Sequence, residues 1–337
     1  MGNRRKFITD LSKLGLLSIA PELFINASPK VTDNKIWGCH LYLTSNQWNI
    51  NFPDLRVDQK TWDDSLKKMA EEGMNMVVIT MGNAVKYQTH PEIAVRNAWS
   101  VTRLRSELDK IRQLGIEPIP LLNFSAAHDI WLQSYERMLS TEKYYAVCSD
   151  LIKEVCEIFD KPRFFHLGMD EETYANQKDY DYVVVRQKDL WWGDFYFLIG
   201  EVEKNGSRPW IWSDYMWHHP ELFFKNMPKS VLQSNWFYKA EFDKKSTPVK
   251  SYLDLEARGF QQVPTGSNWG WDNWQGKDGR ENMINTVKFG AEYISNSNLL
   301  GFLQTSWKET IEENRDAIMN SIQLAGEAKR WFESHGK

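Results

Sequence analysis

Eight short apolar segments alternate with amphipathic helical segments along most of the chain, and this alternation constrains the fold more than any other feature of the sequence. Near-continuous apolar strands separated by helices are typical of a parallel sheet whose outer face the helices cover. Eight such units close into a (β/α)8 barrel, the TIM barrel of the α/β class. The predicted strands span residues 38–44, 76–81, 117–124, 163–168, 209–213, 231–236, 260–265 and 301–307.

The eight units predict one domain, a single catalytic barrel over residues 37–337. No low-complexity segment and no linker rich in proline, glycine and serine interrupts the sequence after residue 36. An open, doubly wound sheet is the alternative arrangement of the same elements. No Gly-x-Gly-x-x-Gly motif follows the first predicted strand, which argues against the nucleotide-binding form of that sheet.

The N-terminus has the features of an export signal of the twin-arginine type. Arg4, Arg5 and Lys6 precede a short apolar run at 14–20, and small residues follow at 27–28. We therefore expect residues 1–30 to direct export, which would place the protein in the periplasm or outside a bacterial cell. A basic amphipathic first helix is the alternative interpretation.

Composition argues against several classes of function and favours one class of ligand. The formal net charge is −4, so we do not expect a basic surface that binds nucleic acid. No window of 18 consecutive apolar residues is present, which argues against a membrane-spanning helix. The three cysteines lack metal-site spacing, and we expect neither a metal nor a cofactor. The 16 Trp, 13 Tyr and 17 Phe residues favour a carbohydrate ligand, because aromatic faces suit the C–H faces of sugars.

Polar and aromatic side chains crowd the predicted carboxyl ends of the strands, which is where a barrel carries its active site. The strongest signal follows the fourth strand, where an apolar run ends in Gly168 and Asp170 and Glu171 come next. Two carboxyl groups held close in a partly dry pocket cannot both ionise easily, so one pKa rises and a glutamic acid can act as a general acid. A helix cap is the alternative role for Asp170. The other candidate site residues are His128, Trp212, Asp214, Trp236, Tyr238, Trp269, Trp307 and Glu309.

The segment that carries the carboxylate pair resembles the catalytic strand of glycoside hydrolase family 20, the β-N-acetylhexosaminidases. That family has His-x-Gly-Gly-Asp-Glu, and this chain has His166-Leu167-Gly168-Met169-Asp170-Glu171. Residues 115–128 are similar to the family's third strand, which ends in a histidine on the substrate side. Residues 301–309 are similar to its eighth strand, and residues 210–214 match its fifth more loosely.

The resemblance implies substrate-assisted, retaining hydrolysis of an N-acetylhexosamine substrate. Glu171 would be the general acid and base. Asp170 would orient the substrate's own 2-acetamido group, whose carbonyl oxygen attacks the anomeric carbon. The remaining implied roles are a hydrogen bond to that group from Tyr238, pocket walls at Trp212, Trp236 and Trp307, a substrate-side imidazole at His128, and a contact with the outer sugar hydroxyls at Glu309.

The chain also departs from the family pattern. Its first strand lacks the family's sugar-gripping arginine, its second lacks His-x-x-Asp-Asp, and Met169 replaces the second glycine of the motif. Two alternatives therefore stay open: a non-catalytic carbohydrate-binding barrel, and a glycosidase that needs no 2-acetamido group. A metal-dependent hydrolase is disfavoured because no His-x-His lies on the first strand. Its ligands would have been His40, His128, His166 and Asp170.

Overall fold

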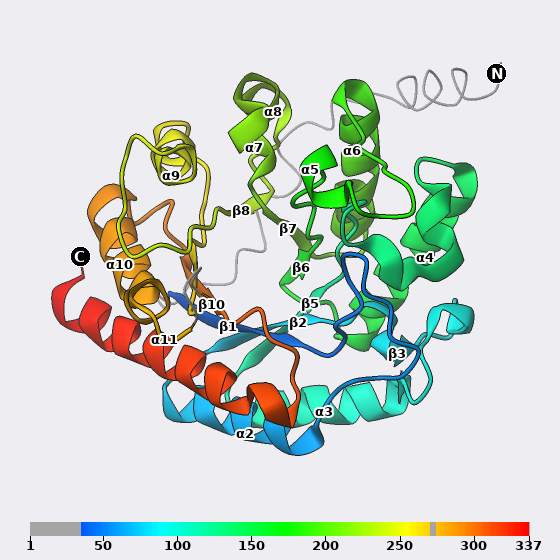
Figure 1. Cartoon of the computed structure of the whole chain (residues 1–337), viewed down its shortest axis with the longest axis horizontal. Coiled ribbons are helices and arrows are strands. Elements are labelled where there is room, and N and C mark those ends of the chain that lie inside the picture. Colours follow the sequence, from blue (N-terminus) through cyan, green and yellow to red (C-terminus); the bar gives the residue numbers. More distant parts are fainter. Residues whose placement is uncertain (1–34, 270–273, 337) are drawn as a thin grey trace. The chain divides into compact units, whose positions relative to one another are not determined.

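The computed structural model describes residues 35–269 and 274–336, in which eight parallel strands form one sheet with helices around it (Figure 1). The strands are three to seven residues long. Their bounds are β1 (Ile36–Tyr42), β2 (Met76–Thr80), β5 (Glu117–Leu121), β6 (Phe164–His166), β7 (Arg208–Trp212), β8 (Leu232–Ser234), β9 (Thr265–Ser267) and β10 (Gly301–Thr305). The predicted export signal at 1–30 lies outside the described residues.

Helices connect the strands and cover the outside of the sheet (Figure 1). None of the helices in the described residues is long and apolar enough to cross a membrane. The α-helices are α2 (Gln59–Glu71), α3 (Val101–Gln113), α4 (Glu142–Ile158), α5 (Tyr174–Gln177), α6 (Lys188–Lys204), α7 (Tyr215–His218), α8 (Pro220–Asn226), α9 (Thr247–Ala257), α10 (Lys277–Tyr293) and α11 (Arg315–His335). Shorter elements are the 3-10 helices η2 (Gly82–Ala84), η3 (Pro91–Ile93), η4 (Asp129–Met138) and η5 (Glu312–Asn314), and a small separate sheet of β3 (Val85–Lys86) and β4 (Trp99–Ser100).

The sheet closes into a barrel. Its strand order is β8-β7-β6-β5-β2-β1-β10-β9, and parallel bridges then join the two outer strands, from Gln233 to Gln262 and from Trp236 to Thr265. The backbone nitrogen of Val263 also donates a hydrogen bond to the oxygen of Gln233 at 2.9 Å. The predicted (β/α)8 barrel is therefore confirmed. The seventh strand was predicted at 260–265, whereas the regular strand β9 begins only at Thr265. The chain before β9 already forms a bridge at Gln262, within the predicted range.

Alternation along each strand separates an inner core from an outer one. In β2, Met76 and Val78 lie in the cluster that fills the barrel, whereas Val77 and Ile79 lie in the cluster between strands and helices. Side chains two residues apart share a face of a strand, so the next inward position in β2 is Thr80. The inward positions at the carboxyl ends of the strands therefore face the mouth of the barrel, where a site can form.

A buried guanidinium ties together the loops that follow β5 and β6. Arg186 lies 2.6 Å from the carboxylate of Glu172 and 3.1 Å from that of Asp194, and all three side chains are almost completely buried. The guanidinium also donates to the backbone oxygen of Phe124 at 2.8 Å. Glu172 accepts a hydrogen bond from the backbone nitrogen of Ala126 at 3.1 Å. One charged cluster therefore links the segments that carry the fourth-strand carboxylates and the third-strand histidine.

We expect Arg186→Met to destabilise the protein by about 3–5 kcal/mol, because it leaves two buried carboxylates without their positive partner. Urea unfolding followed by circular dichroism measures this free energy. Arg96→Met is the matched control, since Arg96 pairs with Asp54 at 2.6 Å on the surface. Exposed pairs contribute little, so the control should unfold at nearly the same urea concentration as the parent. Equal effects of the two substitutions would contradict a structural role for the buried cluster.

Candidate active site

The barrel mouth holds a pocket of about 300 Å³, which we call the mouth pocket. Four residues reach it as the last inward positions of β1, β2, β5 and β7, namely Tyr42, Thr80, Leu121 and Trp212. The other lining residues come from the loops that follow the strands. They are Gln47, Trp48, Asn123, His128, Asp170, Glu171, Trp236, Tyr238, Trp269 and Trp307.

A left-handed turn after β6 presents the two carboxylates. Gly168 has φ 69°, and the non-glycine residues Met169 and Glu171 have φ 73° and φ 59°. A Cβ at Gly168 would lie 2.0 Å from Oδ1 of Asn123, so only glycine fits this position. The backbone nitrogen of Met169 donates to the same Asn123 oxygen at 3.1 Å. A left-handed backbone at bulky residues is uncommon and is typical of functional sites.

His166 supports this turn from inside the barrel wall. Its Nδ1 accepts a hydrogen bond from the backbone nitrogen of Gly168 at 3.0 Å, and the ring is completely buried. Burial, with a smaller contribution from His40, holds the pKa of His166 well below its ordinary value, so the ring is neutral. His166 is therefore a core histidine that also shapes the turn leading to Asp170.

Asp170 and Glu171 converge on one imidazole nitrogen. Nε2 of His128 lies 3.5 Å from Oδ2 of Asp170 and 3.3 Å from Oε2 of Glu171. Asp170 also accepts a hydrogen bond from Nδ2 of Asn123 at 2.8 Å. The side chain of Asp170 is 11% exposed and that of Glu171 is 26% exposed, so Glu171 is the more accessible of the two.

The backbone of Glu171 is fixed on both sides. Its nitrogen donates to Oδ2 of Asp214 at 2.8 Å, and its oxygen accepts from Nδ2 of Asn176 at 2.9 Å. Nε1 of Trp236 lies 3.4 Å from the other oxygen of Asp214. Asp214 therefore holds the backbone under Glu171 in place and is not among the residues that line the mouth pocket.

Aromatic rings form much of the wall of the pocket that also holds the carboxylates. Trp307 packs edge-on against Trp212 with the ring centroids 5.6 Å apart, and Trp236 stacks on Tyr238 at 5.0 Å. Tyr238 also meets the edge of Trp269 at 6.5 Å. Rings arranged in this way give an apolar surface with few polar atoms, which suits the faces of a sugar ring.

Burial and mutual repulsion set the charges of the site. Burial raises the pKa of Asp170, and the charge of Glu171 adds to this rise while His128 opposes it. The pKa of Asp214 lies well above its ordinary value, chiefly because of burial and then because of the charges of Asp170 and Glu171. Burial disfavours the charged form of His128, but the neighbouring carboxylates outweigh it and raise the pKa of this imidazole. The expected rise in a carboxyl pKa is thus found at Asp170.

His128, Asp170 and Glu171 also offer metal-ligand atoms that lie within 4.8 Å of one another, the one such convergence in the described residues. One imidazole and two carboxylates suit a divalent ion such as Zn²⁺ or Mn²⁺. The sequence predicts no metal here. The same three side chains are also what a general acid with a charged neighbour requires, and removal of metal by a chelator distinguishes the two uses.

The structure brings most of the predicted site residues together. Eight of the ten line the mouth pocket, and Asp214 supports it from behind. Glu309 lies apart from the lining, where its carboxylate pairs with Arg56 at 3.1 Å. Sequence reasoning missed Gln47 and Trp48, which follow β1 in a segment with no periodic pattern. Trp48 has φ 56° and places its ring 4.2 Å from that of His128.

We expect Asp170→Asn to lower the pKa of His128, because it removes a negative charge that favours the imidazolium and leaves the opposing effect of burial in place. A pH titration of the histidine ring nitrogens by NMR measures this shift. Asp150→Asn is the control: it removes a carboxylate that lies 3.2 Å from a different histidine, His90. An unchanged His128 titration in Asp170→Asn would contradict the electrostatic coupling.

Comparison with known proteins supports the fold. No family model matches the chain, and no curated protein matches its sequence. A GH20 exo-β-N-acetylglucosaminidase from Vibrio harveyi in complex with N-acetylglucosamine is 12% identical, with a TM-score of 0.60 over 86% of this chain and 54% of that one. A chitobiase from Flavobacterium johnsoniae is 15% identical, with a TM-score of 0.62 over 88% of this chain and 50% of that one. A β-N-acetylhexosaminidase from Bacteroides fragilis is 12% identical, with a TM-score of 0.60 over 90% of this chain and 72% of that one.

The chain thus spans about half the length of the first two of these proteins. At such low identities the likeness concerns the fold. The predicted distant resemblance is confirmed at that level: this chain has the barrel of the glycoside hydrolase family 20 enzymes.

Proposed function

We propose that this chain is a glycoside hydrolase that cleaves N-acetylhexosamine units by substrate-assisted, retaining hydrolysis. The observation that carries the proposal is that Asp170 and Glu171 share one pocket, at the carboxyl ends of the strands, with a wall of aromatic rings. The solved structures with this barrel support the choice of sugar, since one of them holds N-acetylglucosamine.

Glu171 has the position that a general acid needs. Its side chain is partly exposed in the mouth pocket, and its backbone is held by Asp214 and Asn176. In the proposed reaction its carboxyl proton moves to the glycosidic oxygen as the bond to the anomeric carbon breaks. The resulting carboxylate then removes a proton from the water that completes hydrolysis.

The geometry favours a nucleophile supplied by the substrate. A retaining enzyme with its own nucleophile places two carboxyl groups about 5–5.5 Å apart, and an inverting enzyme places them about 6.5–9.5 Å apart. Here Asp170 and Glu171 are adjacent in sequence, and both contact the same Nε2 of His128, at 3.5 and 3.3 Å. They therefore approach a sugar from the same side. No other carboxylate among the described residues lines the mouth pocket.

Asp170 then acts on the acetamido group. As the acetamido oxygen bonds to the anomeric carbon, positive charge develops on the acetamido nitrogen, and an adjacent carboxylate stabilises that charge. Asn123 and His128 hold Asp170 in place for this role. In the proposed complex the acetamido methyl group packs against Trp212, Trp307 and Tyr238, whose rings contact one another.

We expect Glu171→Gln to lower kcat on an aryl N-acetyl-β-glucosaminide by at least roughly 10²-fold, because glutamine has no acidic proton to give to the leaving oxygen. Binding of N-acetylglucosamine, followed by calorimetry, should persist. Glu313→Gln on the exposed 3-10 helix η5 is the matched control and should keep the parent rate. Equal rates in Glu171→Gln and the parent would assign the acid to another residue.

The second prediction concerns the acetamido group. The N-acetyl substrate should be cleaved with retention of the anomeric configuration, and its 2-hydroxy analogue should not be cleaved. Asp170→Asn should lower the rate on the N-acetyl substrate, because an amide stabilises the developing positive charge poorly. NMR of the first-formed product anomer and initial rates on the two aryl glycosides measure these outcomes.

Three results would redirect the proposal. Equal cleavage of both aryl glycosides would indicate a glycosidase that needs no acetamido group. Binding of N-acetylglucosamine without turnover of any glycoside would indicate a carbohydrate-binding barrel. Loss of activity with a chelator, restored by a divalent ion, would indicate a metal at His128, Asp170 and Glu171.

A further inference from the structure

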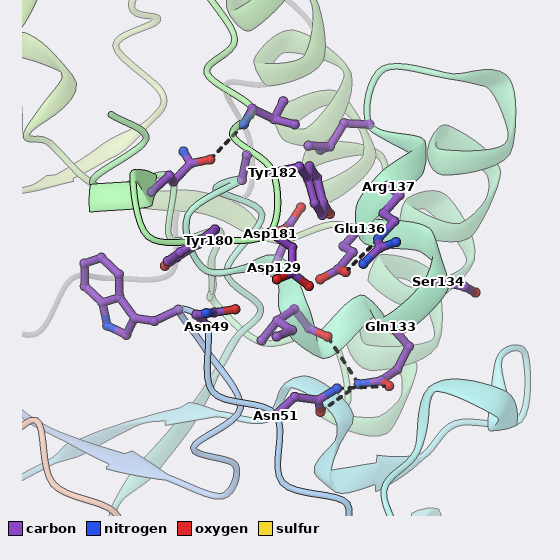
Figure 2. Close-up of a pocket in the computed structure, with 16 residues that line it drawn as sticks. Asn49, Asn51, Asp129, Gln133, Ser134, Glu136, Arg137, Tyr180, Asp181 and Tyr182 are labelled. Atoms are coloured by element: carbon purple, nitrogen blue, oxygen red, sulfur yellow. Dashed lines mark hydrogen bonds and ion pairs between the residues drawn. The ribbon is translucent and has the colours of Figure 1, made fainter. Parts of the chain in front are cut away.

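A second cavity, of about 420 Å³, lies beside the mouth pocket, and we call it the outer pocket (Figure 2). Trp48 lines both cavities. The other walls come from the residues after Trp48, from the 3-10 helix η4 and from the segment between α5 and α6. The lining residues are Trp48, Asn49, Asn51, Ala126, Asp129, Ile130, Gln133, Ser134, Glu136, Arg137, Leu139, Gln177, Tyr180, Asp181, Tyr182 and Val184. A volume of this size lies within the range of small-molecule sites.

The outer pocket contains a buried hydrogen-bond acceptor and a buried donor that the protein leaves unpaired. Asp129 is 4% exposed, and its Oδ2 has no hydrogen-bond partner. Gln177 is 1% exposed; its Oε1 accepts from the backbone nitrogen of Val184 at 2.9 Å, while its Nε2 has no partner. An unpaired buried polar group costs about 1–3 kcal/mol, so such groups are uncommon without a ligand or water. Two of them on one cavity point to a ligand that both accepts and donates hydrogen bonds.

Other polar residues of the outer pocket are already paired within the protein. Gln133 donates to Oδ1 of Asn51 and to the oxygen of Ile130, both at 3.2 Å (Figure 2). The hydroxyl of Tyr180 donates to the backbone oxygen of Ala127 at 2.9 Å. These contacts fix the walls, whereas the buried Oδ2 of Asp129 has no hydrogen-bond partner.

The charge of the outer pocket is negative. Asp129, Glu136 and Asp181 are on one side of it (Figure 2), against the single guanidinium of Arg137. Arg137 is already engaged, since it lies 3.5 Å from Glu136 and over the ring of Tyr182. Asp129 is almost completely buried, so a cation next to its unpartnered Oδ2 would offset the cost of burying this carboxylate.

The arrangement favours an organic cation over a metal ion. The carboxylates of the outer pocket are not among the ligand atoms that converge in the described residues, which are those of His128, Asp170 and Glu171. An ammonium group needs only one carboxylate and can share its other protons with neighbouring oxygens. Hydroxyl groups on the same molecule suit the side-chain amides of Gln177 and Asn51.

We propose that the outer pocket binds an amine-bearing sugar unit, with its ammonium group against Asp129 and a hydroxyl group accepting from Gln177. His128 lines the mouth pocket and the next residue, Asp129, lines the outer pocket. Helix α5 begins three residues after Glu171 and ends at Gln177. Burial, and then the charge of Glu171, raise the pKa of Tyr180 in the wall of the outer pocket, so this pocket adjoins the Glu171 side of the site. If the proposed function holds, on which this step rests, the amino sugar belongs to the leaving-group part of the substrate.

Equilibrium binding tests the proposal without turnover. Glucosamine is titrated by calorimetry into the parent, Asp129→Asn and the control Asp179→Asn, whose exposed carboxylate lies in the same segment but outside the pocket. We expect Asp129→Asn to weaken glucosamine binding at least tenfold, and the control to change it less than twofold. Asp181→Asn, which removes an exposed charge of the pocket, should weaken binding severalfold even if Asp129→Asn fails to fold.

The neutral sugars separate the two cavities. N-acetylglucosamine should bind equally well to the parent and to Asp129→Asn, and more weakly to Trp307→Ala, a variant of the mouth pocket. Glucosamine should bind equally well to the parent and to Trp307→Ala, and more weakly to Asp129→Asn. Three outcomes would overturn the proposal: equal binding of glucose and glucosamine, glucosamine binding that is insensitive to both Asp129→Asn and Asp181→Asn, or binding of Ca²⁺ alone that requires Asp129. Inactivity toward aryl glycosides would contradict the proposed hydrolysis. The binding measurements would still test the outer pocket independently.

Discussion

The buried guanidinium of Arg186 is the interaction on which both cavities depend. It pairs with Glu172, the residue after Glu171, and holds the backbone oxygen of Phe124, four residues before His128. The same ion cluster reaches Asp194 on α6, which also accepts a hydrogen bond from Ser140 at 2.6 Å. The loops after β5 and β6 have few backbone hydrogen bonds of their own, so a satisfied charge cluster behind them defines where His128, Asp129, Asp170 and Glu171 lie. Removing one partner of a buried ion cluster leaves an uncompensated charge, so the loops that carry Glu172 and Phe124 are held to positions in which Arg186 can reach both.

The barrel supplies the second constraint, because its strand alternation decides which residues reach the mouth. The inward positions of β7 include Trp210 and Trp212. Only Trp212, at the carboxyl end of the strand, lines the mouth pocket. Trp210 instead fills the barrel and donates from Nε1 to Ser234 Oγ at 2.7 Å. One side chain of the pair therefore stabilises the fold, and the other shapes the site. The same strand geometry explains why a ring from β7 meets Trp307, which follows β10 on the far side of the barrel.

Much of this arrangement was predictable from sequence, since apolar strands separated by helices predict the barrel and the strand ends then predict the mouth. Asp170, Glu171 and the tryptophans at strand ends were found in that way. Glu309 was predicted by the same rule, but its carboxylate pairs with Arg56 and is not among the residues that line the mouth pocket. The outer pocket was not predictable at all. Its walls lie in η4 and in the segment before α6, where no periodicity exists, and Gln133 interrupts η4 with φ 55°. Tertiary contacts such as the Arg186 cluster fix those segments, and no local pattern reports them.

The proposed mechanism explains why Asp170 is buried where a carboxylate is costly. Burial and the charge of Glu171 both oppose ionisation of Asp170, whereas His128, Asn123 and a backbone hydrogen bond favour it. A positive charge on the acetamido nitrogen, which would develop as the glycosidic bond breaks, would also favour the ionised form of Asp170. The interaction is therefore stronger in the transition state than in the empty site, which is the condition for catalysis rather than for binding alone. The aromatic wall increases the difference, since it excludes water that would otherwise screen the new charge. An exposed aspartate in the same position would stabilise both states almost equally and would accelerate the reaction far less.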